Sequence, residues 1–491
     1  MPVDYDVIMI GTGIGGSACA ALLAHAGFKV LILEKNKLVG GMSSSYEKEG
    51  FIIDSAIHVF SSGIQGRFGK ILKKVECPDL LKFVPITDRT ALRALGQKGY
   101  TRLAFNPASL QSEKKDTPNF KNQEQVDLSK MGFRGNDMKT LMTIMGSILQ
   151  TGKRKLKAMH EEKLTFEKYL EQYSPTSGVK SLLAFLTGGM FGLPPRTASA
   201  PELIQGLQEW VITNDLSYPL GGAIAVPQAF LTAAQKYGGE VRTNAKVSKI
   251  IVENGEAKGV ILDGEPIYSK IVVSNAGIKP TVNSLVGNEH FDNEYIEKVE
   301  NLVPSYSAIT FKFALKEPII DHYVFVNLYH GDLSVFGEKE RTPGGPKATG
   351  FMTMIPSNAD PNLAPPGHQL VIFGTLAPTH SMDWDAFLDH YYQDILKFYP
   401  EIEDKMLFKD ITTPLALAQM SGKAFGPIET TALIPGQAGS YRISSELPIE
   451  NLFVVGDTAG TDTHGIGTQL AADSGMKGAK LIIEKYKRIL A

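Results

Sequence analysis

The sequence predicts an α/β fold, because two apolar runs flank a glycine-rich turn near its start and a third precedes a similar turn near its end. Residues 6–10 are apolar and stop at a glycine, and residues 17–26 are rich in alanine and leucine, which indicates strand, turn and helix. Residues 28–33 form a second β-branched and leucine-rich run, so these elements predict a βαβ unit with buried parallel strands. Residues 452–455 predict a late strand, and a helix follows it through residue 481.

The middle of the chain divides into helical and sheet segments. Residues 139–173 have long side chains and few glycines, which predicts helices. Residues 240–275 alternate apolar and polar side chains around Asn254-Gly255 and Asp263-Gly264, which predicts strands joined by tight turns. Residues 98–130 are polar and predict a surface excursion, not a domain boundary.

Composition and charge exclude several classes of protein. The 491 residues are 43% hydrophobic and 21% charged, which suits a globular protein of one large or two ordinary domains. Lys and Arg total 50 against 52 acidic residues, so we expect no nucleic-acid partner. Cys19 and Cys77 lie far apart, so neither a disulfide framework nor a metal site is expected. No leader-like start and no run of roughly 18 apolar residues is present, which favours a cytoplasmic location.

The first glycine-rich turn has the spacing of a dinucleotide site. Gly11, Gly13 and Gly16 fit G-x-G-x-x-G between a strand and a helix, where backbone amides at the helix start can face a pyrophosphate. Glu34 ends the second strand, where a carboxylate can accept both ribose hydroxyls and disfavours the 2′-phosphate of NADP. The alternative is a glycine turn that binds nothing. We expect cofactor contacts at Gly11, Gly13, Ile14, Gly15, Gly16, Glu34 and Lys35.

Further motifs resemble those of a flavin fold. Gly40-Gly41 and Met42 follow Glu34 closely and lead to residues 50–54, a layout that resembles the glutathione-reductase-type FAD-binding Rossmann domain. Gly456-Asp457 resembles the second flavin motif of that fold, in which the acid holds a ribityl or pyrophosphate-side hydroxyl. The alternative for Asp457 is an ordinary helix N-cap. Residues 464–475 would begin a helix whose positive N-terminal end faces the pyrimidine edge of the flavin and stabilises the anionic reduced flavin. Cofactor contacts are expected there at Gly465, Ile466 and Gly467.

Nearly the whole chain resembles the phytoene desaturase, carotenoid isomerase and retinol saturase group, within the amine-oxidase-like superfamily. The similarity rests on the terminal motifs, on residues 218–222 and 238–276, and on residues 185–202. It implies that the backbone near Val247 lies against the adenine, that Asn275 lies in the cofactor site, and that residues 185–202 line the substrate cavity. Ala56 departs from the group, which commonly has glycine there.

The resemblance implies a discontinuous FAD-binding domain, residues 1–70, 220–285 and 415–491, with an inserted α+β substrate domain, residues 71–219 and 286–414. The dinucleotide fingerprint occurs once, and no cysteine lies in the C-terminal region where related amine oxidases attach FAD. We therefore expect noncovalent FAD, no NAD domain, a hydrophobic small-molecule substrate and an unknown electron donor or acceptor.

Catalytic candidates follow from the same segments. His58, Arg196 and His464 fall where the resemblance places flavin or substrate, and each can donate, accept or orient a proton; Glu202 and Tyr218 lie in these segments too. Each has an ordinary structural alternative: a hydrogen-bonded histidine, an arginine that caps a helix or pairs with Glu202, and an acid at a helix start.

Residues 138–157 have two interpretations. Apolar side chains recur at helical spacing and a basic cluster follows, which suits either a peripheral membrane contact over anionic lipid or a buried helix with a solvated end. The apolar positions are Met138, Leu141, Met142, Met145, Ile148 and Leu149, and the basic ones are Lys153, Arg154, Lys155 and Lys157.

The leading functional hypothesis is desaturation, saturation or cis-trans isomerisation of carbon–carbon double bonds in an isoprenoid or polyene. A flavin amine oxidase is the first alternative, but an aromatic cage cannot be assembled from Tyr218, Phe425 and Tyr441. A non-enzymatic prenyl-lipid escort protein is the second, and the retained motifs at residues 456–457 and 465–467 argue against it.

Overall fold

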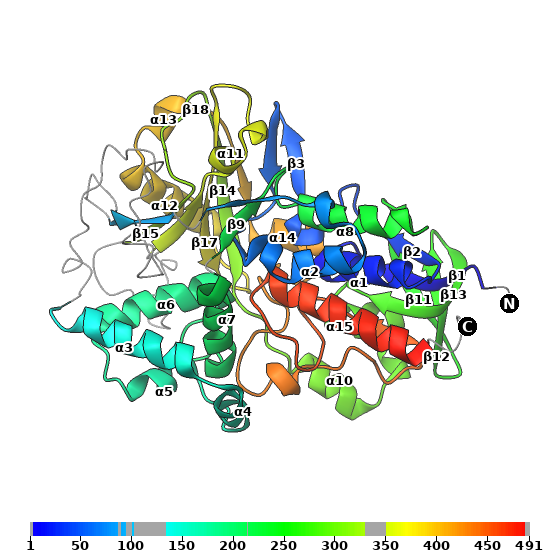
Figure 1. Ribbon diagram of the computed structural model, residues 1–491. Coiled ribbons are helices and arrows are strands. Elements are labelled where there is room, and N and C mark those ends of the chain that lie inside the picture. Colours follow the sequence, from blue (N-terminus) through cyan, green and yellow to red (C-terminus); the bar gives the residue numbers. More distant parts are fainter. Residues whose placement is uncertain are drawn as a thin grey trace.

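The computed structural model describes residues 3–86, 90–94, 101–102, 134–213, 215–328 and 350–486. Its architecture is α/β with two large sheets, which confirms the predicted fold class (Figure 1). Most of the polar segment at 98–130 lies outside the described residues. Among the residues described, no helix is both long and apolar enough to cross a membrane.

The first sheet has seven strands and a parallel core. The βαβ unit is present, with β1 and β2 parallel, and β13 lies on the other side of β1. β19 pairs in parallel with β13, so strands from opposite ends of the sequence are neighbours. The strands are β1 (Tyr5–Ile10), β2 (Val30–Leu33), β10 (Glu240–Arg242), β11 (Val247–Glu253), β12 (Glu256–Leu262), β13 (Glu265–Ser274) and β19 (Leu452–Val454).

Both faces of this sheet are buried because its side chains alternate between two hydrophobic clusters. Val7 and Met9 of β1 pack against helices, whereas Ile8 and Ile10 pack on the opposite face. The turns between β11, β12 and β13 have positive φ at all four predicted positions, Asn254, Gly255, Asp263 and Gly264. The covering helices are α1 (Ile14–His25), α2 (Arg67–Lys74), α8 (Ala225–Lys236) and α15 (Thr468–Tyr486).

The second sheet also has seven strands and is mostly antiparallel, and α12 (Trp384–Phe398) covers one face with aromatic contacts. Its strands are β7 (Thr90–Ala94), β8 (Thr101–Arg102), β14 (Ser307–Leu315), β15 (Val324–Leu328), β16 (Gly350–Met354), β17 (Gln369–Ala377) and β18 (Met406–Thr412). Small sheets add β3 (Ser45–Lys48), β4 (Phe51–Asp54), β5 (Phe60–Ser61), β6 (Phe83–Pro85) and β9 (Leu216–Pro219).

A helical layer forms below the second sheet in the view of Figure 1 and has its own hydrophobic core. It contains α3 (Asp137–Gln150), α4 (Lys153–Glu161), α5 (Phe166–Glu171), α6 (Ser177–Phe191) and α7 (Ala200–Thr213), which confirms the helices predicted in residues 139–173. The remaining helices are α9 (Ile278–Pro280), α10 (Asn293–Glu300), α11 (Pro356–Ala359), α13 (Ile402–Lys405) and α14 (Pro414–Ser421).

Helix α3 has a buried face, as the buried-helix interpretation predicts, and the membrane contact stays a prediction. Ile144 and Ile148 are fully buried in the core of the helical layer, whereas Met138, Met142 and Leu149 are exposed, Met142 to 59%. The helix therefore has one apolar face in the core and a second apolar face that the described residues leave uncovered.

Candidate functional site

The two glycine-rich loops lie against each other. They follow β1 and β19, which both pair with β13. A Cβ atom on Gly15 would lie 2.7 Å from Gly456 Cα, and one on Gly475 would lie 2.3 Å from the Gly15 carbonyl oxygen. Side chains at these positions would separate α1 from α15, so glycine is required for close approach. The structure thus brings Gly11, Gly13, Ile14, Gly15 and Gly16 together with Gly456 and Asp457.

Asn275 lies between these loops at the end of β13. When its amide oxygen faces the Gly13 amide and its nitrogen faces the Val455 carbonyl, both contacts are 3.2 Å. A Cβ atom on Gly16 would lie 2.9 Å from Asn275 Cβ, so this side chain also sets the spacing of the loops. Its contact with a cofactor stays a prediction.

Glu34 is held at the edge of the first loop. Its Oε2 accepts hydrogen bonds from the Thr12 amide at 3.1 Å and the Thr12 hydroxyl at 2.6 Å, and its Oε1 accepts from the Asn36 amide at 2.9 Å. The Gly40 amide donates to Thr12 Oγ1 at 3.0 Å, which joins the Gly40-Gly41 turn to the first loop. The two oxygens of a carboxylate can accept further hydrogen bonds, so Glu34 can also bind the hydroxyl groups of a ribose.

Three other residues are predicted to contact the nucleotide half of the cofactor: Lys35, Met42 and Val247. Lys35 Nζ donates to the Gln419 carbonyl at 3.0 Å, which ties the end of β2 to α14. Met42 lies in a short 3-10 helix, Gly41–Ser43, and is half-buried, whereas Val247 begins β11 and is buried. Their contact with FAD stays a prediction.

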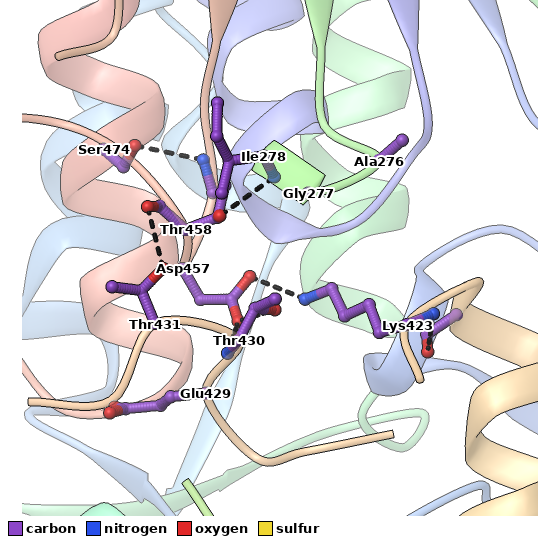
Figure 2. Close-up of polar contacts among 12 residues, drawn as sticks. Ala276, Gly277, Ile278, Lys423, Glu429, Thr430, Thr431, Asp457, Thr458 and Ser474 are labelled. Carbon is purple, nitrogen blue, oxygen red and sulfur yellow. Dashed lines mark hydrogen bonds and ion pairs between the residues drawn. The ribbon is translucent and has the colours of Figure 1, made fainter. Parts of the chain in front are cut away.

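Asp457 is the centre of a polar cluster (Figure 2). Its Oδ1 pairs with Lys423 Nζ at 2.6 Å, and its Oδ2 accepts from the amide and the hydroxyl of Thr430, both at 2.7 Å. Burial alone would raise the pKa of Asp457, but Lys423 and Thr430 hold it below its ordinary value, so the carboxylate is charged. The helix N-cap interpretation is wrong, because the next helix, α15, begins only at Thr468.

The backbone around Asp457 is fixed by hydroxyl groups (Figure 2). Thr458 Oγ1 accepts from the Ile278 amide at 3.0 Å, and Thr431 Oγ1 donates to the Thr458 carbonyl at 3.1 Å. Ser474 of α15 accepts from the Gly456 amide at 3.0 Å and donates to the Ala459 carbonyl at 2.7 Å. The second loop is therefore fixed before any ligand binds.

His464 belongs to a network that sequence reasoning missed. Glu202 of α7, whose side chain is 1% exposed, lies 3.3 Å from Nδ1 of His464 and 3.3 Å from Nε2 of His160 in α4. Burial would raise the pKa of Glu202, but the two histidines lower it to about 2. The charged carboxylate therefore orients His464 immediately before Gly465 and Gly467.

The segment that leads into the N-terminus of α15 contains two glycines. Gly465 and Gly467 have φ of 124° and 50°, so the chain turns sharply into α15. Ile466 packs on α7, where a Cβ on Gly206 would lie 2.9 Å from its Cδ1. The first turn of α15 has no acidic side chain, and its amides fit a group that accumulates negative charge.

His58 follows β4, and Arg196 lies in the turn before α7, the helix that carries Glu202. His58 Nδ1 is 3.2 Å from the Ala56 carbonyl and its ring stacks on Phe60 at 5.7 Å. Burial lowers the pKa of His58, so the ring is neutral near pH 7. Arg196 is half-buried in the turn between α6 and α7. Catalytic roles for both stay predictions.

A buried lysine near His58 was also missed. Lys312 of β14 is 1% exposed, and its Nζ donates to the Ser55 carbonyl at 3.0 Å and to the Thr412 hydroxyl. Burial lowers its pKa to about 8. The signal was present in the sequence, because a lysine interrupts the apolar run Ser307–Leu315, whose residues are all buried.

These residues fit FAD. The glycine loops have no side chains that would fill the cradle, Glu34 suits a ribose, and the α15 N-terminus suits the flavin. Close to Asp457, the buried atoms Glu429 Oε2 and Arg442 Nε and Nη1 find no hydrogen-bond partner among the described residues, as expected where a polar ligand completes a site.

Residues 14–483 match the flavin containing amine oxidoreductase family, and the chain belongs to this family. It is a flavin-containing oxidoreductase. This finding confirms the predicted family, class of enzyme and cofactor.

Particular relatives cover most of the chain. Prolycopene isomerase of Arabidopsis thaliana is 26% identical over 99% of this chain and 84% of its own length. All-trans-retinol 13,14-reductase of Homo sapiens is 24% identical over 93% and 82%, and phytoene desaturase of Fusarium fujikuroi is 26% identical over 75% and 66%. An oxidoreductase from Methanosarcina mazei has a TM-score of 0.72 at 21% identity over 97% and 99% of the two chains. Cyclohexylamine oxidase from Brevibacterium oxydans has 0.65 at 14% over 99% and 100%, and these two structures show the fold alone.

Proposed function

We propose that this enzyme uses noncovalently bound FAD to desaturate, saturate or isomerise carbon–carbon double bonds of a hydrophobic isoprenoid or polyene. One observation carries the proposal: relatives with each of these three activities in their names align with most of the chain. The proposed FAD domain comprises residues 1–70, 220–285 and 415–491, and the proposed substrate domain comprises residues 71–219 and 286–414.

Bound FAD supplies hydride transfer, and the protein supplies binding and orientation. Asp457, fixed by Lys423 and Thr430, would hold a hydroxyl of the cofactor, and Glu34 would hold the ribose. Glu202 keeps the imidazole of His464 oriented and able to hold a proton at Nδ1. Saturation also requires a proton, and because Nδ1 of His464 faces Glu202, we propose Nε2 of His464 as its source, with His58 and Arg196 as further candidates.

The aromatic residues available do not favour an amine oxidase. Tyr218 is buried and its hydroxyl donates to Asp54 at 2.5 Å, whereas Tyr441 is partly exposed and Lys163 lies 5.8 Å from its ring centre. Tyr218 and Tyr441 therefore already have structural roles, and no ring contact among the described residues joins them with Phe425 into an aromatic cage.

The test begins with the visible spectrum of the purified protein and chromatography of the nucleotide released by heat. If FAD is released, the loaded protein is incubated anaerobically with phytoene-type, cis-polyene and retinol substrates, once with oxidised flavin, which can accept electrons in desaturation, and once with dithionite-reduced flavin, which can donate them in saturation. Desaturation lengthens the conjugated system and shifts its absorbance to longer wavelength, saturation shifts it to shorter wavelength, and isomerisation leaves the flavin without net reduction. Turnover of amines with hydrogen peroxide release, and none with polyenes, would overturn the proposal.

We propose in addition that α3 and α4 contact an anionic membrane surface. Met138, Met142 and Leu149 are exposed along α3, and a basic cluster at Lys153–Lys155 begins α4. Exposed apolar side chains beside cations match the chemistry of a lipid surface.

Sedimentation with vesicles containing phosphatidylserine tests the contact. Replacing both exposed methionines, Met138→Ser and Met142→Ser, is expected to release most of the protein from the vesicles. The control is Leu407→Ser, which removes a similarly exposed side chain, 48%, from β18 of the second sheet. Equal binding of the double variant and the control would refute the contact.

A further inference from the structure

The N-terminus of α15 faces a buried carboxyl group that the protein uses only in part. Glu429 has no exposed surface, and its Oε1 accepts a hydrogen bond from the Gly467 amide at 3.3 Å. Its Oε2 is buried, and no group of the described residues forms a hydrogen bond with it. Figure 2 shows that this side chain points away from the Lys423–Asp457 pair, although Glu429 directly precedes Thr430 in the chain. Its second oxygen therefore remains available to a ligand.

A buried guanidinium close by is also incompletely bonded. Arg442 is 2% exposed, and its Nη2 donates to the Asp457 carbonyl at 2.6 Å, whereas Nε and Nη1 have no partner in the part of the chain that the structure describes. In the described part of the chain no hydrogen bond joins Arg442 to Glu429. Buried polar groups without partners are unfavourable, and two of them beside one helix N-terminus indicate a ligand that completes them.

The charges around Glu429 decide its protonation. Burial raises the pKa of Glu429 to about 8. Asp457 and Glu202 also raise it, whereas Arg442 and the hydrogen bond from the Gly467 amide lower it. At neutral pH the carboxyl group is therefore protonated and can donate a hydrogen bond, which an ionised carboxylate cannot do.

We propose that Glu429, as the neutral acid, donates a hydrogen bond from its unpartnered oxygen to FAD bound at the N-terminus of α15, beside the fixed positive charge of Arg442. This inference rests on the proposed orientation of FAD in the site. A neutral donor and a nearby cation favour the reduced flavin, which carries more negative charge, whereas an ionised Glu429 opposes it. Glu429 thus sets the reduction potential of the flavin.

The test is the midpoint potential of the FAD-loaded protein between pH 6 and 10, by equilibration with reference dyes. Glu429→Gln keeps the shape and a donor but removes the ionisation, and Glu429→Leu removes both. The control, Glu209→Gln, removes a carboxylate that pairs with Arg67 at 2.9 Å and is partly exposed. We expect Glu429→Leu to lose at least tenfold in relative affinity for reduced flavin at pH 6.5, which is about 30 mV for two electrons.

The Gln variant is expected to match the wild type at pH 6.5 and to lack the additional fall in potential that the wild type shows above pH 8. Both variants following the wild type throughout would overturn the inference. If the Leu variant does not fold, an unchanged high-pH fall in the Gln variant overturns it. A wild-type protein that binds no FAD would instead overturn the cofactor assignment, and this inference with it.

Discussion

Replacing Gly475 with alanine should separate the two loops of the FAD cradle. Gly475 lies in α15, where a Cβ atom would be 2.3 Å from the Gly15 carbonyl oxygen and 3.2 Å from Ala18 Cβ. Ordinary contacts begin near 3.4 Å, so α15 must move by roughly 1 Å from α1, and the obstructing atom is backbone. Overpacking of this kind costs about 3 kcal/mol, and the higher helix propensity of alanine returns about 1 kcal/mol.

The expected net loss in the free energy of unfolding is therefore about 2 kcal/mol, measured from urea unfolding curves. Because Gly15 lies in the pyrophosphate loop, FAD must restore the original spacing, and its affinity should fall by about 30-fold in a fluorescence titration. Gly146→Ala is the matched control, since a Cβ there meets no atom within 4 Å and the change should stabilise α3 by about 0.5–1 kcal/mol. Equal stability and equal FAD affinity of the two variants would refute the reasoning.

Three further predictions concern buried groups. Tyr218→Phe removes the 2.5 Å hydrogen bond to Asp54 and should lower the free energy of unfolding by about 1–3 kcal/mol; an unchanged urea midpoint contradicts this. Burial would raise the pKa of Glu202, but its two histidine partners lower it from 4.5 to about 2, so its stabilisation of about 3 kcal/mol is complete above pH 4.5 and is lost as the pH falls toward 2. Glu202→Gln should flatten the acid limb of the pH–stability curve, and an unchanged limb excludes this role. Cys19 is fully buried, which raises its pKa, so thiol reagents should modify it only in urea; labelling of the native protein contradicts this.

Sequence reasoning succeeded where the signal is local. The turns at Asn254-Gly255 and Asp263-Gly264 require positive φ at consecutive residues, and Asn, Asp and Gly adopt it readily. The βαβ unit was likewise predictable from apolar runs and glycines within thirty residues.

It failed where residues meet only through tertiary packing. Glu202 contacts His160 and His464, which come from α4 and from the segment before α15, and no spacing in the sequence relates the three. The partners of Asp457 could not be predicted either, because Lys423 and Thr430 lie on a loop that has no sequence motif of its own. The solitary lysine at position 312 was visible in an apolar strand. Its contact with Ser55, however, depends on how β14 packs against the end of β4.

The pairing of β19 with β13 imposes an order on biosynthesis. The first glycine loop leaves the ribosome more than four hundred residues before β19 and α15. At 5–20 residues per second the interval is roughly 20–90 s, during which the nascent chain has only one wall of its cofactor site. Until β19 is synthesised, the edge of β13 that it will occupy has no partner strand from the second glycine loop, so FAD cannot meet both halves of its cradle before then.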